Sequence, residues 1–171
     1  MNGTHNLLIL GGARSGKSRY AQARAEALAG DLVFIATARA FDDEMTDRIV
    51  RHRLDRGPRW RTVEAPIDLS DAVTAEARPG NVLLVDCLTL WASNLMLAER
   101  DHLAEVDHLI AALRAARAPV IVVTNEVGLG IVPDNALARA FRDVAGTINQ
   151  VVAAAVDEAC FLVAGLPMRL K

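Results

Sequence analysis

Cysteine is scarce in this sequence, and its distribution excludes two classes of small domain. The 171 residues include only two cysteines. Cys87 and Cys160 lie far apart in apolar stretches, which favours buried free thiols over a disulfide framework. No group of Cys and His has the spacing of metal ligands. The chain is therefore expected to be neither a disulfide scaffold nor a domain built around a Cys/His metal site.

Membrane and secretory features are also missing. No apolar run approaches the length of a membrane span. Residues 1–6 carry neither the basic segment nor the long apolar stretch of a secretory signal. We therefore expect a cytoplasmic protein without a membrane span.

Excess charge of either sign is absent, and so is any sign of a second domain. Nineteen Lys and Arg nearly balance 21 Asp and Glu, for a formal net charge of −2 at pH 7. Nothing in this balance argues for an anionic partner, so we expect no nucleic acid to bind. No repeat or linker divides the chain, and residues 1–171 are most simply one domain.

A complete phosphate-binding pattern, G-x-x-x-x-G-K-[ST], follows the apolar run at 7–10. In such a loop, glycines let the backbone curl around phosphate oxygens, and the next helix directs unsatisfied N–H groups at the anion. Lys17 would reach the β and γ phosphates, and the Ser18 hydroxyl would ligate Mg²⁺. The alternative is a chance match in an ordinary strand-to-helix turn. The predicted nucleotide-binding residues are Gly11, Gly12, Ala13, Arg14, Ser15, Gly16, Lys17 and Ser18.

Buried strands alternate with helices along the chain. Apolar runs typical of parallel sheets predict strands at 7–10, 32–38, 82–86, 119–126 and 160–165, and alternation predicts an extended edge at 60–65. Helices are expected at 19–29, 42–53, 68–77, 89–98, 104–117 and 134–158. Gly30 is expected to cap the first helix and Asp134 the last. This order predicts an α/β fold of three layers around a mostly parallel sheet.

Polar side chains follow two of these strands. Asp86 ends the strand at 82–86, as the carboxylate of a Walker-B strand does beside the Mg²⁺ of a phosphate loop. The alternative is an acid that only caps the next helix. Asn125 and Glu126 end the strand at 119–126, and ligands of open α/β sheets bind outside the carboxyl ends of strands. We therefore expect both residues to face the crevice of the phosphate loop.

Four segments together resemble the adenosylcobinamide kinase/adenosylcobinamide-phosphate guanylyltransferase family. They are residues 11–18, 35–38 (Ile-Ala-Thr-Ala), 42–45 (Asp-Asp-Glu-Met) and 124–133 (Thr-Asn-Glu-Val-Gly-Leu-Gly-Ile-Val-Pro). Phe-Arg-Asp at 141–143 and residues 146–149 add to the resemblance, which spans nearly the whole chain. It implies a P-loop NTPase domain of RecA-like type, and a homotrimer.

The resemblance also implies two reactions of cobalamin (vitamin B12) biosynthesis. The first phosphorylates adenosylcobinamide, a corrinoid, with ATP or GTP. The second takes GMP from GTP onto an enzyme histidine and passes it to the new phosphate, which gives adenosyl-GDP-cobinamide. His52 is the histidine that matches, with Lys17 as the second catalytic residue. Further residues implied to contact nucleotide are Ala36, Thr37, Ala38, Arg53, Leu54, Asp55, Arg56, Glu64 and Asp86, with Ser18 and Asp86 holding Mg²⁺.

Several of these residues have plainer alternatives. A neutral imidazole is a good nucleophile toward an activated phosphorus, but Met45, Ile49 and His52 share a helical face, so His52 could be a packing residue. The arginines from Arg48 to Arg61 could form a solvated face, and Glu64 an exposed edge-strand acid. The family's usual Arg-Pro step reads Arg-Gly-Pro at 56–58 here. Trp60 and Trp91 are expected to be packing or rim residues.

Two other functions compete with this interpretation. One is a small-molecule P-loop kinase without nucleotidyl transfer, which GTP would not label covalently. The other is a regulatory nucleotide switch that binds a partner protein. Against the switch, the chain has no Asn-Lys-x-Asp signature for reading guanine.

Overall fold

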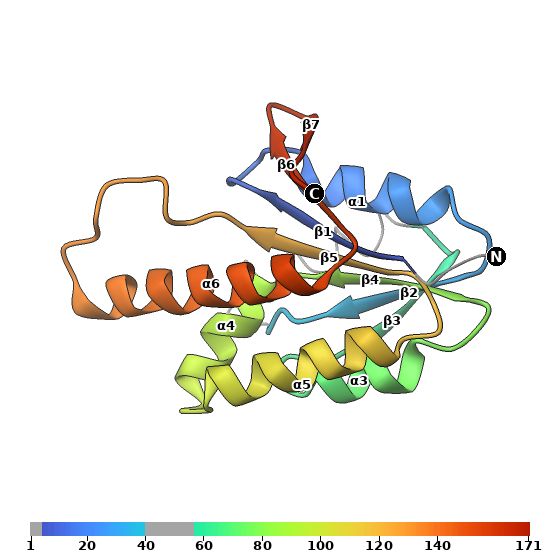
Figure 1. Ribbon diagram of the computed structural model, residues 1–171, viewed down its shortest axis with the longest axis horizontal. Helices are drawn as coiled ribbons and strands as arrows, with labels where there is room; N and C mark the ends of the chain where they lie inside the picture. Colours follow the sequence, from blue (N-terminus) through green and yellow to red (C-terminus); the bar gives the residue numbers. More distant parts are fainter. Residues whose placement is uncertain (1–4, 40–56) are drawn as a thin grey trace.

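One seven-stranded sheet organises the protein. The computed structural model describes residues 5–39 and 57–171 (Figure 1). The strands are β1 Asn6–Gly11, β2 Asp31–Ala36, β3 Trp60–Glu64, β4 Asn81–Asp86, β5 Val120–Asn125, β6 Glu158–Val163 and β7 Leu166–Arg169. The helices are α1 Lys17–Glu26, α3 Leu69–Glu76, α4 Leu88–Leu97, α5 His102–Ala115 and α6 Ala136–Ala155. The strand order is β3-β2-β4-β5-β1-β6-β7, and only β7 runs antiparallel to its neighbour.

Helices cover both faces of this sheet, so the predicted three-layer α/β fold is confirmed. Helix α1 lies on one face, and α3, α4, α5 and α6 lie on the other (Figure 1). Successive strand side chains alternate between the two faces. Leu8 and Val85 belong to the core beneath α3 to α6, whereas Ile9 and Leu84 belong to the core beneath α1. The continuous apolar runs of the central strands are therefore explained by burial on both faces.

The strand register brings the predicted site segments to one edge of the sheet. Gly11 of β1 lies opposite Asn125 of β5, and Ala36 of β2 lies opposite both Asp86 of β4 and Glu64 of β3. The Glu126 N–H donates to the Gly11 carbonyl over 3.1 Å. As expected, Asn125 and Glu126 adjoin the phosphate loop. We call this side of the molecule the carboxyl edge, at the left of Figure 1, and the opposite side the amino edge.

Two predicted helix caps are wrong. Helix α1 ends at Glu26, so Gly30 does not cap it. Gly30 has φ +144°, and a Cβ there would lie 2.6 Å from the Gly80 carbonyl oxygen, so this glycine permits two turns to approach closely. The N-cap of α6 is Asn135 rather than Asp134, since the Asn135 side chain accepts the N–H of Ala138 over 2.7 Å.

The last predicted strand is one half of a hairpin. Helix α6 ends at Ala155, β6 begins at Glu158, and β7 pairs with β6 as an edge strand. The turn between them has positive φ at Ala164 (52°) and Gly165 (81°), as tight hairpin turns require. Across residues 5–39 and 57–171, no helix is both long enough and apolar enough for a membrane crossing.

Candidate nucleotide-binding site

The phosphate loop connects β1 to α1 and leaves the start of the helix uncapped. The N-cap residue, Gly16, is left-handed (φ 92°) and, as a glycine, has no side chain to cap the first N–H groups of α1. Within the loop the Ser15 N–H donates to the Gly12 carbonyl over 3.3 Å. Uncapped N–H groups at a helix start form an anion site, since they also carry the positive end of the helix dipole. This geometry fits the predicted phosphate cradle.

Two of the loop's glycines are required by close approaches. A Cβ at Gly11 would lie 2.5 Å from Ser15 Oγ and 2.9 Å from the carbonyl oxygen of Leu162. A Cβ at Gly16 would lie 3.2 Å from the Cα of Gly165, whose N–H donates to the Ser15 carbonyl over 2.8 Å. The β6–β7 turn therefore packs against the phosphate loop and supports it. This contact could not be expected from the sequence, because β7 was not predicted.

Lys17 is a buried cation inside the loop. The residue is only 9% exposed, and its Nζ donates to the Gly12 carbonyl over 2.9 Å. Burial lowers the pKa of Lys17 from its usual value, and the nearby Asp86 carboxylate opposes that shift. A cation with so little water around it gains much from an incoming anion. Lys17 is therefore suited to bind phosphate oxygens.

Ser18 and Asp86 supply the oxygen atoms that could hold a divalent cation. Ser18 lies in the first turn of α1, and Asp86 lies at the carboxyl end of β4. Asp86 is close enough to Lys17 for its charge to influence the pKa of the ammonium group. A hydroxyl and a carboxylate are hard oxygen donors of the kind that Mg²⁺ prefers, with phosphate oxygens and waters as further ligands. The two residues thus fit a magnesium site beside bound phosphates.

The remaining predicted site residues divide into four groups. Ala36 and Ala38 flank the carboxyl end of β2, beside the strand that carries Asp86. Glu64 is exposed at the end of the edge strand β3, in register with Ala36. Thr37, by contrast, is fully buried, and its hydroxyl is already hydrogen bonded to the backbone of Cys87. His52 and residues 53–56 (Arg53, Leu54, Asp55 and Arg56) lie outside the described residues.

A buried hydrogen-bond network at the end of β5 was not predicted. The Thr124 hydroxyl donates to Asn149 Oδ1 over 2.7 Å, and Asn149 Nδ2 donates to the Asn125 carbonyl over 3.0 Å. The Thr89 hydroxyl accepts the Asn125 N–H over 2.7 Å. These bonds tie α4 and α6 to the strand beside the phosphate loop. Thr124 and Asn149 fall within segments that carry the family resemblance, and that is the only sequence signal that pointed to them.

Comparisons with solved structures agree with this architecture. The assembled ATPase EscN of the enteropathogenic E. coli type III secretion system matches 94% of this chain with a TM-score of 0.63 at 14% identity. Another type III secretion ATPase matches 94% with a TM-score of 0.58, also at 14% identity. This chain spans 43% and 52% of those two chains. At this identity the likeness shows the fold alone, which is that of P-loop ATPases.

Sequence comparisons show the family. The bifunctional adenosylcobalamin biosynthesis protein CobU of Salmonella typhimurium is 43% identical over 96% of this chain and 99% of its own length. The CobP protein of the same description from Pseudomonas aeruginosa is 46% identical over 96% of both chains. The family model described as "Cobinamide kinase / cobinamide phosphate guanyltransferase" matches residues 7–170. The chain therefore belongs to the cobinamide kinase/cobinamide phosphate guanylyltransferase family.

Proposed function

We propose that one phosphate-loop site on this chain serves both reactions of its family. The enzyme is a cobinamide kinase and a cobinamide phosphate guanylyltransferase of adenosylcobalamin biosynthesis. In the first reaction it phosphorylates adenosylcobinamide with ATP or GTP. In the second it transfers GMP from GTP to give adenosyl-GDP-cobinamide. The observation that carries the one-site proposal is the buried Lys17 cation beside the uncapped start of α1. Ala36, Glu64 and Asp86 lie at the same carboxyl edge.

In the kinase reaction, the protein positions the triphosphate and offsets its charge. The β and γ phosphates are bound by the N–H groups at the start of α1 and by the Lys17 ammonium. These groups stabilise the negative charge that develops on the leaving nucleoside diphosphate in the transition state. Mg²⁺ held by Ser18 and Asp86 would neutralise charge on the same oxygens. The corrinoid's hydroxyl attacks the γ-phosphorus, its proton is lost, and the nucleoside diphosphate leaves.

For the guanylyl reaction we assign His52 as the nucleophile. Its neutral imidazole attacks the α-phosphorus of GTP, a P–N bond forms, and pyrophosphate leaves. The phosphate of adenosylcobinamide phosphate then attacks the same phosphorus and the imidazole leaves. Cys87 is a poor rival, because burial raises the pKa of its thiol to about 11 and so keeps it protonated at neutral pH.

Labelled GTP tests this function directly. With adenosylcobinamide present, label at the γ-phosphorus should reach the corrinoid, and label at the α-phosphorus should reach the protein first and the corrinoid later. Protein and corrinoid are separated and counted independently. Corrinoid labelled only from the γ position, with no label on the protein, would support a kinase without nucleotidyl transfer. No labelled corrinoid at all would favour a nucleotide switch.

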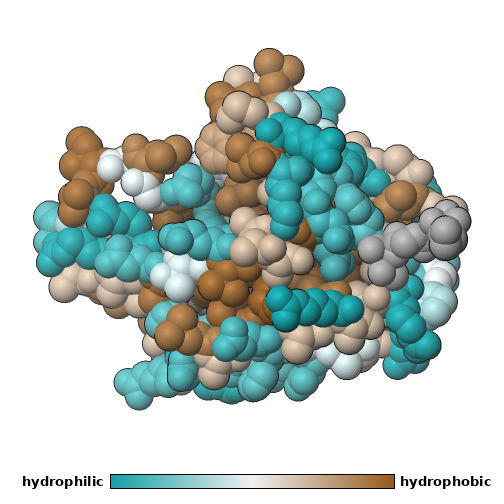
Figure 2. All heavy atoms as spheres, viewed as in Figure 1, coloured by the Kyte–Doolittle hydropathy of each residue, from teal (hydrophilic) through white to brown (hydrophobic). Residues whose placement is uncertain are grey.

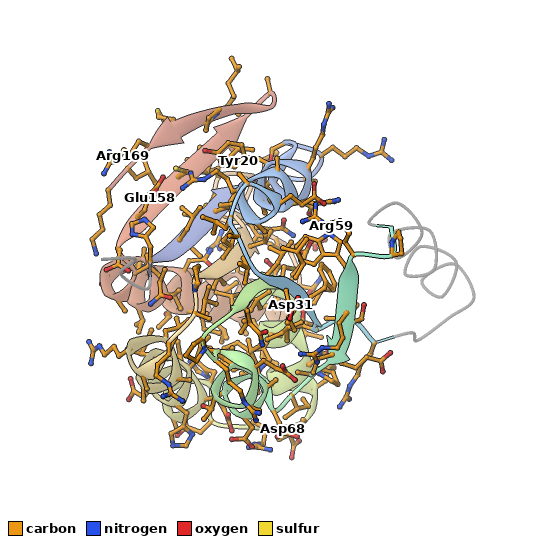
Figure 3. The ribbon with its side chains drawn as sticks, turned by 90° about the vertical axis from the view of Figure 1, so that its right-hand side faces the viewer. Tyr20, Asp31, Arg59, Asp68, Glu158 and Arg169 are labelled. Atoms are coloured by element: carbon orange, nitrogen blue, oxygen red, sulfur yellow. The ribbon has the colours of Figure 1, made fainter. Side chains whose placement is uncertain are left out.

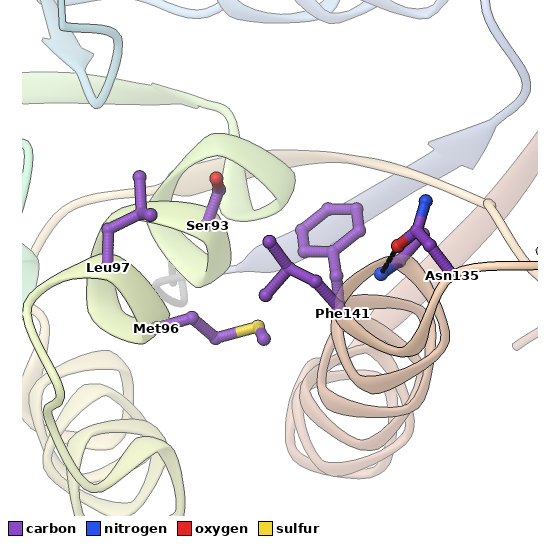
Figure 4. Close-up of a pocket in the computed structure, with 7 residues that line it drawn as sticks. Ser93, Met96, Leu97, Asn135 and Phe141 are labelled. Atoms are coloured by element: carbon purple, nitrogen blue, oxygen red, sulfur yellow. Dashed lines mark hydrogen bonds between the residues drawn. The ribbon is translucent and has the colours of Figure 1, made fainter.

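The proposed homotrimer is supported by an apolar surface at the carboxyl edge. Figure 2 shows apolar side chains on the segment between β5 and α6, where Leu129 is 81% exposed and Ile131 is 98% exposed. Beside this segment, α4 and α6 enclose an apolar pocket of about 300 Å³, whose lining includes Met96 and Phe141 (Figure 4). A projecting apolar segment and an apolar pocket on the same chain suit a head-to-tail contact between copies, and such contacts close into a ring when the rotation between copies permits it.

Light scattering on purified protein tests this contact. Wild type should have the mass of three chains, and Ile131→Asp should be monomeric, because a carboxylate cannot enter an apolar pocket without a large desolvation cost. Leu103→Asp is the matched control, since Leu103 is 52% exposed on α5 and should be indifferent. A trimeric Ile131→Asp protein would place the interface elsewhere.

We also place the enzyme in the cytoplasm. Both cysteines are buried free thiols, as is usual in a reducing compartment. The nucleotides that its family uses are abundant there. Fractionation of cells that produce the protein, followed by an activity assay of each fraction, checks this assignment.

A further inference from the structure

Thr37 occupies a position where its side chain cannot reach a ligand. The residue is 0% exposed, and its hydroxyl makes two hydrogen bonds to one residue. It donates to the Cys87 carbonyl over 2.7 Å and accepts the Cys87 N–H over 2.8 Å. The Thr37 side chain therefore holds both backbone groups of the residue that follows Asp86.

The Thr37 backbone is held as firmly as its side chain. Its N–H donates to the Asp86 carbonyl over 3.4 Å. Its carbonyl accepts from Asn94 Nδ2 over 2.8 Å, and the same amide nitrogen donates to the Pro66 carbonyl over 2.9 Å. Asn94 is itself only 3% exposed. We call this group the Thr37–Asn94 clamp: Thr37, Asn94, Pro66 and the backbone of Asp86 and Cys87.

The clamp joins segments that the site needs in a fixed relation. Thr37 follows β2, Asp86 ends β4, Pro66 follows β3, and Asn94 lies on α4. Buried polar groups cost stability unless they are paired, and here the Thr37 and Asn94 side chains pair with the backbone groups of Cys87, Thr37 and Pro66. The hydrogen bonds of the clamp lie between the predicted nucleotide-binding segment 36–38 and Asp86, the predicted Mg²⁺ ligand. Such a position favours a role beyond holding the sheet together.

We propose that Thr37 and Asn94 are positioning residues that set the Asp86 carboxylate relative to residues 36–38 and Lys17, and so set the affinity for nucleotide with Mg²⁺. This inference rests on the proposed function for the identity of the nucleotide and for the Mg²⁺ role of Asp86. The family resemblance implied that Thr37 contacts nucleotide, and this proposal gives its side chain a different role, because the buried hydroxyl already bonds both the carbonyl and the N–H of Cys87.

Two substitutions at Thr37 separate hydrogen bonding from packing. Thr37→Val keeps the shape of the side chain but removes the hydroxyl, which leaves the buried N–H and carbonyl of Cys87 without that partner. Thr37→Ser keeps the hydroxyl and loses only a methyl group, which leaves a small cavity. A positioning role predicts that the serine variant behaves like wild type in binding, whereas the valine variant does not.

The experiment measures binding rather than turnover. A fluorescent GTP analogue labelled on the ribose is titrated with Mg²⁺ and again with EDTA, and thermal unfolding is followed in parallel. In Mg²⁺, Thr37→Val and Asn94→Leu should bind about tenfold more weakly, the scale of one lost buried hydrogen bond. In EDTA the loss should be smaller, because Asp86 acts through the cation.

Asn6→Leu is the matched control for stability. Asn6 is also buried, and its Nδ2 donates to the Leu113 carbonyl over 3.0 Å, but it lies at the amino edge. Its melting temperature should fall without a change in nucleotide affinity. Wild-type affinity in Thr37→Val, or an equal loss of affinity in Asn6→Leu, would overturn the clamp. If Thr37→Val does not fold, Asn94→Leu carries the same test. Tight binding by wild type without transfer to adenosylcobinamide would refute the proposed function and leave the clamp intact.

Discussion

The two edges of the sheet use polar residues in opposite ways. Among the described residues, seven polar or charged side chains are buried, and six of them serve the carboxyl edge. These six are Lys17, Thr37, Thr89, Asn94, Thr124 and Asn149. The amino edge buries only Asn6. Since a buried polar group costs stability unless it is paired, their concentration at one edge supports the proposal that ligands bind there.

The amino edge relies instead on partly exposed ion pairs. Glu158 of β6 accepts two hydrogen bonds from the guanidinium of Arg24 on α1, each over 3.0 Å, and lies 3.0 Å from His5 Nε2. Tyr20 of α1 lies nearby (Figure 3), with Arg24 over its ring. These contacts lower the pKa of Glu158 to about 2. This cluster ties the start of β6 to α1, far from the site, and so should contribute stability without activity.

Lys17→Ala should show the largest functional effect at the carboxyl edge. Both reactions need the triphosphate in the loop, so both should fall at least about 10²-fold, the scale of one preorganised electrostatic contact. The fold should survive, because the substitution also removes a buried charge that burial disfavours. Turnover of both reactions and thermal unfolding are measured on the same preparation. Near-normal turnover in the folded variant would remove the loop from the mechanism.

Asp86→Asn should give a smaller defect that depends on the cation. The amide keeps the size of the side chain but loses its charge, and removal of a group that holds a metal through water costs about 10- to 100-fold. Loss of the carboxylate should also lower the pKa of Lys17 further. A Mg²⁺ titration of the kinase rate should show the defect shrinking as Mg²⁺ rises. A defect that Mg²⁺ does not change would indicate helix capping or direct substrate contact instead.

Glu158→Gln should have the smallest effect on activity and a clear effect on stability. Loss of the charged hydrogen bonds to Arg24 should cost about 1–3 kcal/mol of unfolding free energy, with turnover per folded molecule unchanged. The pH dependence follows from the lowered pKa of Glu158. Its stabilisation is complete above about pH 4.5 and is lost as the pH falls toward 2, so wild type and variant should converge in acid.

Urea unfolding at several pH values measures this convergence. His5→Ala is the control, because its side chain is 51% exposed and such exposed pairs contribute about 0–1 kcal/mol. A difference between wild type and Glu158→Gln that persists at pH 2 would contradict the assignment of the stabilisation to the Glu158 carboxylate.

Much of the fold could be predicted because the signal is local. A strand buried on both faces must be apolar throughout, so the central strands were visible in the sequence, and the alternation at 60–65 indicated the edge strand β3. The strand β7 was not predicted, because all four of its residues are exposed and one of them is Pro167. The end of α1 was predicted too late in the chain, because residues that favour a helix continue to Ala29. The turn that follows the helix instead packs closely on Gly80 through Gly30, a contact between residues distant in sequence.

The candidate site also has parts that are local in sequence and parts that are not. The phosphate loop is contiguous in sequence, so its residues and their roles could be predicted. The clamp joins Thr37 to residues 50 and 57 positions away, and no periodicity reveals such a partner. Only the family resemblance pointed to Thr37, as a nucleotide contact, and Asn94 was not singled out at all.

The central claim is that two reactions share one phosphate loop and diverge at His52. Wild type, Lys17→Ala and His52→Ala are each incubated with GTP labelled at the α-phosphorus, and kinase activity is measured with label at the γ-phosphorus. Wild type should take up α label in a form that is labile to acid and stable to alkali, as phosphoramidates are. The Lys17 variant should lose both activities, and the His52 variant should phosphorylate adenosylcobinamide but stay unlabelled. Labelled His52→Ala protein, or an adduct that survives acid, would contradict the claim.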